Sequence, residues 1–135
     1  MGNLAQVQRS SQVNTHEFIW KNAYLLADKA GMTAASKCDV QMIVVTGYEY
    51  DPFPICGFAW VNFKPATTRF VRWLKNKGIA SKAFTGGATM WVDKFGQSYD
   101  RKCAYAMAFA QVIRKELVEA GHEPTLKVYA SSRLD

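Results

Sequence analysis

The feature of the sequence that most restricts the fold is a stretch without a charged residue, 103–113, rich in alanine. Ser98 precedes it at a spacing that suits a helix cap. A helix that is apolar around most of its circumference needs other elements to cover it. We therefore predict a long helix over about 99–120 that lies across a sheet, with Met107 and Phe109 filling the core.

The length of the chain, 135 residues, fits one globular domain. Hydrophobic residues make up 49% and charged residues 21%, which excludes a wholly disordered chain. We predict a flexible arm over 1–14, which is rich in Gln, Ser and Asn, and a single domain over 15–135. The chain has neither a long apolar block for a membrane span nor a secretory signal, so we expect a cytoplasmic protein with no membrane partner.

Two further helices are predicted before the long one. The first covers about 16–30 and ends at Gly31, and the second covers about 67–77 and ends at Gly78. The second helix is amphipathic. Its apolar residues fall on one side of the helical wheel and its cations on the other: Phe70, Val71, Trp73 and Leu74 against Arg69, Arg72 and Lys75.

Strands are predicted at 40–48, 56–63, 88–95 and 126–130 from β-branched and aromatic residues bounded by Gly and Pro. The sequence Asp51–Pro54 reads as a turn that joins the first two strands in a hairpin. Together these elements predict an α+β fold, with helices packed on one face of a mostly antiparallel sheet.

Charge is distributed unevenly along the chain. The 41 residues between Asp51 and Asp93 contain no acidic residue and carry a charge of +6, whereas the remainder has 11 basic and 11 acidic residues. Clustered cations repel one another, and an anionic partner relieves this repulsion. A solvated face that only keeps the protein soluble is the alternative. The cations concerned are Lys64, Arg69, Arg72, Lys75, Lys77 and Lys82.

A second candidate site lies at the start of the long helix. Lys94, Ser98, Arg101 and Lys102 could bind a phosphate or carboxylate there, helped by the helix dipole. An ordinary serine cap explains Ser98 equally well. This group is also the basis of an alternative function, an enzyme that acts on a phosphorylated or nucleotide substrate.

Aromatic residues near the cations suggest stacking. Trp73 flanks the arginines of the second helix, and Trp91 lies on the predicted strand after Gly86-Gly87. Three more aromatic residues lie near the predicted hairpin tip: Tyr48, Tyr50 and Phe53. A basic groove with aromatic platforms is typical of proteins that bind single-stranded nucleic acid. Core packing is the alternative for the tryptophans, and the chain lacks the signature motif of a known RNA-binding module.

Signals for catalysis, cofactors and metals are missing from the sequence. Cys38, Cys56 and Cys103 are widely spaced, so we expect reduced, structural thiols without a bound metal. Gly86-Gly87 leads into a predicted strand instead of a helix, so it reads as a turn and not as a phosphate-binding loop. We predict no catalytic residue and no cofactor.

Several short segments of the sequence together carry a resemblance. They are Cys56-Gly57-Phe58-Ala59, Arg69-Phe70-Val71-Arg72-Trp73-Leu74, Phe95-Gly96-Gln97-Ser98, Lys102, Ala104-Tyr105-Ala106 and Arg133-Leu134-Asp135. These segments resemble a group of small bacteriophage and prophage proteins of unassigned function. The similarity covers about residues 42–120 and the C-terminal tail, and it implies a phage setting in the host cytoplasm.

We therefore expect a non-enzymatic phage accessory protein. Its basic helix face would engage nucleic acid or a host complex with an anionic surface, including a defence complex that handles nucleic acid, which it would inhibit. Besides the enzyme, a virion or assembly component that uses residues 1–14 to reach a neighbouring subunit is a further alternative.

Overall fold

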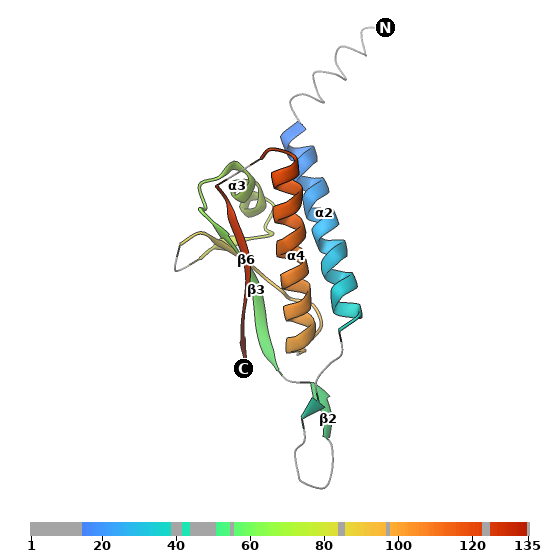
Figure 1. Ribbon diagram of the computed structural model, residues 1–135. Coiled ribbons are helices and arrows are strands. Elements are labelled where there is room, and N and C mark those ends of the chain that lie inside the picture. The colour runs from blue at the N-terminus through green and yellow to red at the C-terminus, as the bar shows by residue number, and fades with distance from the viewer. Residues whose placement is uncertain are drawn as a thin grey trace, which may run out of the picture.

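In the residues that it describes, the computed structural model contains two long helices, one short helix and two antiparallel sheets (Figure 1). It describes residues 15–38, 42–43, 51–54, 56–83, 86–96, 98–122 and 125–134. In chain order the elements are α2 (Thr15–Ser36), β1 (Met42–Ile43), β2 (Asp51–Pro54), β3 (Gly57–Lys64), α3 (Arg69–Asn76), β4 (Ser81–Lys82), β5 (Ala88–Trp91), α4 (Tyr99–Glu119) and β6 (Lys127–Leu134).

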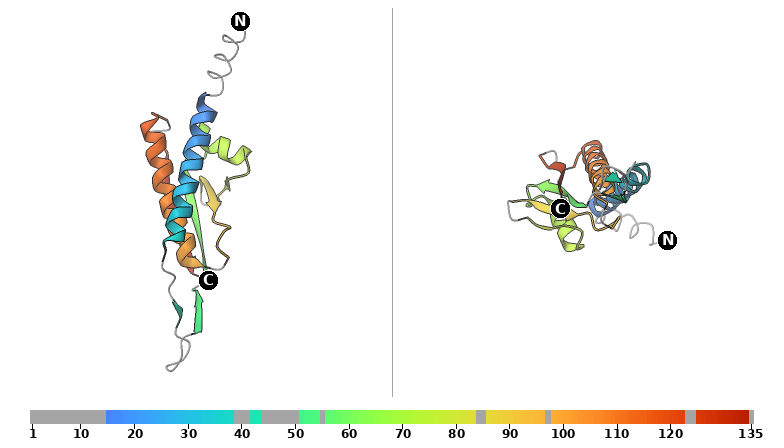
Figure 2. Two further views of the ribbon diagram at one scale, coloured as in Figure 1. Left: turned by 90° about the vertical axis from the view of Figure 1, so that its right-hand side faces the viewer. Right: turned by 90° about the horizontal axis from the view of Figure 1, so that it is seen from below.

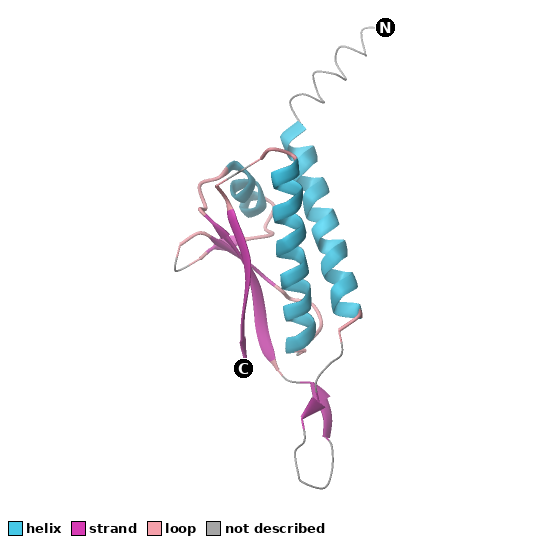
Figure 3. Ribbon diagram, in the orientation of Figure 1, coloured by secondary structure: helices cyan, strands magenta, loops and turns pink. Residues whose placement is uncertain are grey.

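The main sheet has four strands in the order β4-β5-β3-β6, and all neighbours are antiparallel. Strand β3 is central, with Trp60 opposite Trp91 on one side and Val61 opposite Ala130 on the other. Helices α2 and α4 lie side by side along one face of this sheet, and α3 lies next to α2 on the same face (Figures 2 and 3). The α+β fold with helices on one face is thus confirmed.

The core lies between the helices and the inner face of the sheet. Val61 and Phe63 of β3 are fully buried, as are Phe109 and Ile113 of α4. Met107, which we expected in the core, is 57% exposed. The reason is that α4 contacts the sheet and α2 along only part of its circumference, so its remaining side faces solvent.

Helix α2 is longer than predicted, because Gly31 lies inside it instead of ending it. A Cβ atom at Gly31 would overlap the ring of Tyr105 on α4, so the glycine allows α2 and α4 to pack closely. Position 31 therefore does require glycine, but the reason is the close packing of two helices and not the end of a helix.

The predicted hairpin is wrong. Asp51–Pro54 forms strand β2, which pairs with β1, whereas β3 pairs with β5 and β6. The β1–β2 pair lies below the main body in Figure 1. Alternation of apolar residues identifies β3 as a strand but does not identify its partners, which are distant in the sequence.

The sequence does not predict strand β4, and the remaining elements agree with their predictions apart from their lengths. Helix α3 ends before Gly78, which has φ of 74°, and α4 begins after the cap residue Ser98. Strand β5 stops at Trp91, and β6 continues to Leu134 because it pairs with β3 along its whole length.

None of the described helices is long and apolar enough to cross a membrane. The predicted arm over 1–14 lies outside the described residues.

Candidate functional site

Helix α3 is fixed by its apolar side. Phe70, Val71 and Leu74 are fully buried, and the ring of Phe70 lies 6.3 Å from that of Trp20 on α2 and 6.2 Å from that of Phe63 on β3. These contacts hold the short helix in one orientation. Its opposite side is therefore directed to solvent.

The solvent side of α3 carries Arg69, Arg72 and Lys75, and Lys77 follows at its end; all four are exposed. We call these four residues the α3 basic face. In the part of the chain that the structure describes, a salt bridge joins Lys94 to Asp28, and none involves the α3 basic face. Lys82 is also exposed, on the short strand β4.

Trp73 does not belong to this surface. It is only 8% exposed, and its ring lies 6.1 Å from Trp20 and stacks at 6.0 Å on Phe70. Of the two interpretations of this tryptophan, core packing is the one that the structure supports. The Trp73 ring packs inward although Trp73 lies about one turn after Arg69 on the helix.

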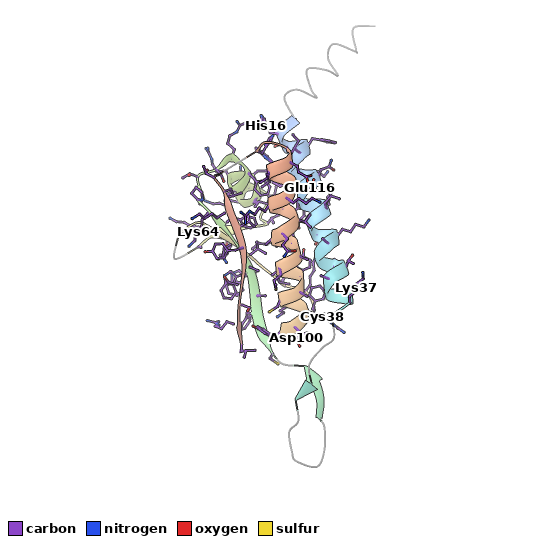
Figure 4. The ribbon with its side chains drawn as sticks, viewed as in Figure 1. His16, Lys37, Cys38, Lys64, Asp100 and Glu116 are labelled. Carbon is purple, nitrogen blue, oxygen red and sulfur yellow. The ribbon has the colours of Figure 1, made fainter. Side chains whose placement is uncertain are left out.

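A pocket lies at the Arg69 end of α3. It is lined by His16, Trp20, Arg69, Gly121 and His122, and the two histidine rings are 4.9 Å apart. Trp20 Nε1 donates a hydrogen bond of 3.2 Å to Nδ1 of His122. Figure 4 shows His16 at the end of the molecule where α2 begins. The pocket thus extends from the α3 basic face toward the first turn of α2.

The predicted site at the start of α4 is not assembled. Ser98 is buried, and its Oγ accepts a hydrogen bond from the backbone N–H of Arg101, as a helix cap does. Lys102 is buried too, and its Nζ donates to the carbonyl oxygen of Gly57 at 3.2 Å and lies 5.5 Å from the ring centre of Phe58. Only Arg101 is exposed. These residues hold α4 against β3 and do not form a common anion site.

Lys94 forms an ion pair within the fold. Its Nζ lies 2.8 Å from Oδ1 of Asp28, which also accepts a hydrogen bond from the hydroxyl of Tyr105. Burial alone would raise the pKa of Asp28, but the hydrogen bonds from Lys94 and Tyr105 lower this pKa below its ordinary value. The pKa of Tyr105 is raised, first by burial and then by Asp28. The cluster connects α2, α4 and the segment that follows β5.

The outer face of the sheet is a second surface, which the sequence did not reveal. Strand residues alternate between the two faces, so Phe58, Trp60 and Lys64 of β3 point away from the helices (Figure 4 shows Lys64). Trp91 and Tyr129 join them from the neighbouring strands and are 48% and 42% exposed. Within the described ranges, no helix covers this face (Figure 2).

Aromatic rings and cations are mixed on this outer face. The ring centres of Trp60 and Trp91 are 4.6 Å apart, and that of Phe58 is 6.2 Å from Trp91. Arg133 lies over Phe58 at 5.5 Å, and Lys64 lies 5.9 Å from the ring centre of Tyr129. We call these six residues, together with Lys127, the open sheet face. The four strands of the main sheet contain no acidic residue.

The aromatic residues of the predicted hairpin tip are not among the side chains that the structure describes. Tyr48 and Tyr50 lie outside the described residues, and Phe53 lies in β2, where its side chain is not described.

The three cysteines are half-buried. Among the residues whose positions are described, no group of His, Cys, Asp or Glu could hold a metal ion.

Comparison with other proteins gave no match. No family model matches the chain, and neither a curated protein nor a solved structure is significantly similar to it. The resemblance to phage proteins therefore stays a prediction.

Proposed function

We propose that this protein is a non-enzymatic binding protein that holds a nucleic acid against the α3 basic face. The observation that carries the proposal is the combination of four exposed cations on α3 and its end with a firmly packed opposite side. Such cations are preorganised, because the helix that carries them does not need to order on binding. A polyanion would relieve their mutual repulsion.

The absence of acidic residues from the sequence around α3 favours phosphate as the partner group. Residues 52–92 contain no Asp or Glu, so every charged side chain of this interval attracts phosphate. Contacts with phosphates supply most of the affinity of sequence-independent nucleic-acid binding. The biological setting that we propose is a bacteriophage accessory role in the host cytoplasm.

A charge-reversal experiment tests the proposal. We expect the triple substitution Arg69→Glu, Arg72→Glu and Lys75→Glu to weaken binding to labelled oligonucleotides by about 100-fold or more, measured by fluorescence anisotropy. The matched control reverses three exposed cations elsewhere and changes the net charge equally: Lys21→Glu, Lys29→Glu and Lys115→Glu. Thermal melting of both variants checks that they fold.

The control separates a defined site from a general charge effect. A much larger loss in the α3 variant supports the proposal. Equal losses in both variants would mean that only net charge matters, and unchanged binding by the α3 variant would refute the proposal.

An acidic host protein could engage the same cations. Affinity purification from host lysate with and without nuclease distinguishes the two partners, because a partner held through nucleic acid is lost on nuclease treatment. One outcome would identify an acidic host protein as the partner instead of nucleic acid. In it, wild type still captures a protein after nuclease treatment, and the α3 variant does not capture this protein.

A further inference from the structure

The open sheet face has the composition of a stacking surface for bases. Trp91 and Tyr129 are the two large aromatic side chains with the highest exposure on the sheet, at 48% and 42%. Trp60 and Phe58 lie between them and are half-buried. Exposed aromatic rings of this size are unfavourable in water unless a partner covers them.

The strand register arranges these rings across the sheet. Trp91 on β5 is opposite Trp60 on β3, and Tyr129 on β6 is opposite Asn62, two residues further along β3. Neighbouring strands are about 4.8 Å apart, and alternate residues on one strand are about 6.7 Å apart. Trp60 and Trp91 are therefore in contact, Phe58 lies on one side of this pair along β3, and Tyr129 lies diagonally on the other side, so the rings extend across the sheet from β5 to β6.

Cations accompany these rings. Arg133 lies over Phe58, and Lys64 lies beside Tyr129 and is paired in register with Lys127. Asp93 lines the pocket beside Trp91, just beyond β5, and so marks the end of this group of rings at which phosphates would be repelled. The favourable path for phosphates runs along the β6 side and past Lys64, and only residues 65–68 connect Lys64 with Arg69, the first residue of α3.

We propose that the open sheet face stacks the bases of a single-stranded nucleic acid while the α3 basic face binds its phosphates. This inference rests on the function proposed above and specifies the class of nucleic acid. Bases in a duplex are stacked on each other and cannot lie on the rings, whereas bases of a single strand can.

Binding of a second copy of the chain to the open sheet face is unfavourable. A two-fold symmetric contact would place the same surface on both sides, so Lys64, Lys127 and Arg133 would face a surface that carries the same three cations. The four strands supply no carboxylate to neutralise them. Like charges across an interface are destabilising.

Recognition on this face is independent of base identity. Asn62 is the one amide side chain at its centre, and its Nδ2 already donates to the carbonyl oxygen of Tyr129 at 3.2 Å and to Oγ of Ser131 at 2.8 Å. Asn62 is also 8% exposed. Stacking without hydrogen bonds to base edges tolerates any sequence.

The test uses Trp91→Ala and Tyr129→Ala. Binding of each variant to a labelled single strand of mixed sequence, about one dozen nucleotides long, is compared with binding to the matching duplex. We expect each substitution to weaken single-strand binding by about 10-fold and to leave duplex binding within about 2-fold of wild type. Phe18→Ala is the control, because Phe18 is an aromatic residue 66% exposed on α2, away from the sheet.

Each other outcome overturns the inference. Unchanged single-strand binding by both variants, or equal losses on single strand and duplex, would show that the rings do not stack on bases. A wild-type dimer that Trp91→Ala dissociates would identify a second copy as the occupant. A nuclease-resistant protein partner lost in Trp91→Ala would identify a protein.

The α3 triple reversal keeps the two proposals distinguishable. If that variant loses binding while Trp91→Ala and Tyr129→Ala do not, the proposed function stands and only the stacking inference fails. If the α3 variant binds normally, or wild type binds no oligonucleotide at all, the proposed function fails as well. Thermal melting checks that Trp91→Ala and Tyr129→Ala remain folded.

Discussion

The ring of Tyr105 on α4 lies against the backbone of Gly31 on α2, in the space that a side chain at position 31 would occupy. The same tyrosine donates its hydroxyl hydrogen bond to Asp28, one turn earlier on α2. One aromatic residue thus sets both the separation of the two long helices and a polar contact between them.

Gly31→Ala should destabilise the protein. In an exposed helix interior this substitution stabilises by about 1 kcal/mol, but here the new methyl group overlaps the Tyr105 ring. We expect a loss of about 1 to 3 kcal/mol in the free energy of unfolding, measured by urea denaturation. An increase in stability would contradict the packing described for α2 and α4.

Asp28→Asn should change the pH dependence of stability. The pKa of Asp28 is lowered in the fold from its ordinary value of 3.8, so its ionised form stabilises the native state above about pH 4. This contribution is lost as the pH falls through the lowered pKa. We expect Asp28→Asn to be less stable than wild type by roughly 1 kcal/mol at pH 7, with the difference shrinking toward pH 2. Thermal melts across this range measure the difference, and one that is constant with pH would contradict the assignment.

The parts of the fold that could be predicted are those whose signals are local. Helix α3 has its apolar and cationic residues at helical spacing, and α4 has its cap at Ser98, so both were located within a few residues. Pairing of the strands depends on partners far apart in the sequence, such as Trp60 with Trp91, and this information is not carried by either strand alone.

The candidate site was predictable only in part for the same reason. The exposure of Arg69 and Arg72 follows from one helical wheel, whereas the burial of Lys102 depends on the carbonyl of Gly57, which lies 45 positions earlier. To predict the open sheet face, one must also know that all the described helices lie on one side of the sheet. The alternation from Phe58 to Lys64 was visible in the sequence, but which side would stay uncovered was not.

Phe109→Ala should cost about 3 to 5 kcal/mol in the free energy of unfolding, because Phe109 is fully buried between α4, α2 and the sheet. Met107→Ala is the matched control on the same helix, since Met107 is 57% exposed. We expect it to change stability by less than about 0.5 kcal/mol. Sizing and thermal melting measure both variants, and a stable, monomeric Phe109→Ala variant would show that α4 contributes a binding surface instead of core.

Lys102→Met should leave nucleic-acid affinity within about 2-fold of wild type, because the Lys102 amine is buried against the carbonyl of Gly57 and cannot reach a phosphate. Methionine has a similar volume and no charge to bury, so the free energy of unfolding should change by no more than about 1 kcal/mol. Anisotropy and urea denaturation measure the two effects. A loss of affinity in a variant that stays folded would restore the start of α4 as part of the binding site.

The salt dependence of binding should separate the two surfaces. Each phosphate contact to a single strand contributes about 0.7 to the slope of log affinity against log salt concentration. Replacing Arg69, Arg72 and Lys75 with alanine should therefore reduce the magnitude of the slope by roughly 2, if each residue contacts one phosphate. Trp91→Ala removes a ring and no charge, so it should lower affinity at every salt concentration while leaving the slope unchanged. Anisotropy titrations at several salt concentrations measure both quantities. A change of slope in Trp91→Ala, or an unchanged slope in the triple alanine variant, would contradict the division of phosphate binding and base stacking between α3 and the sheet.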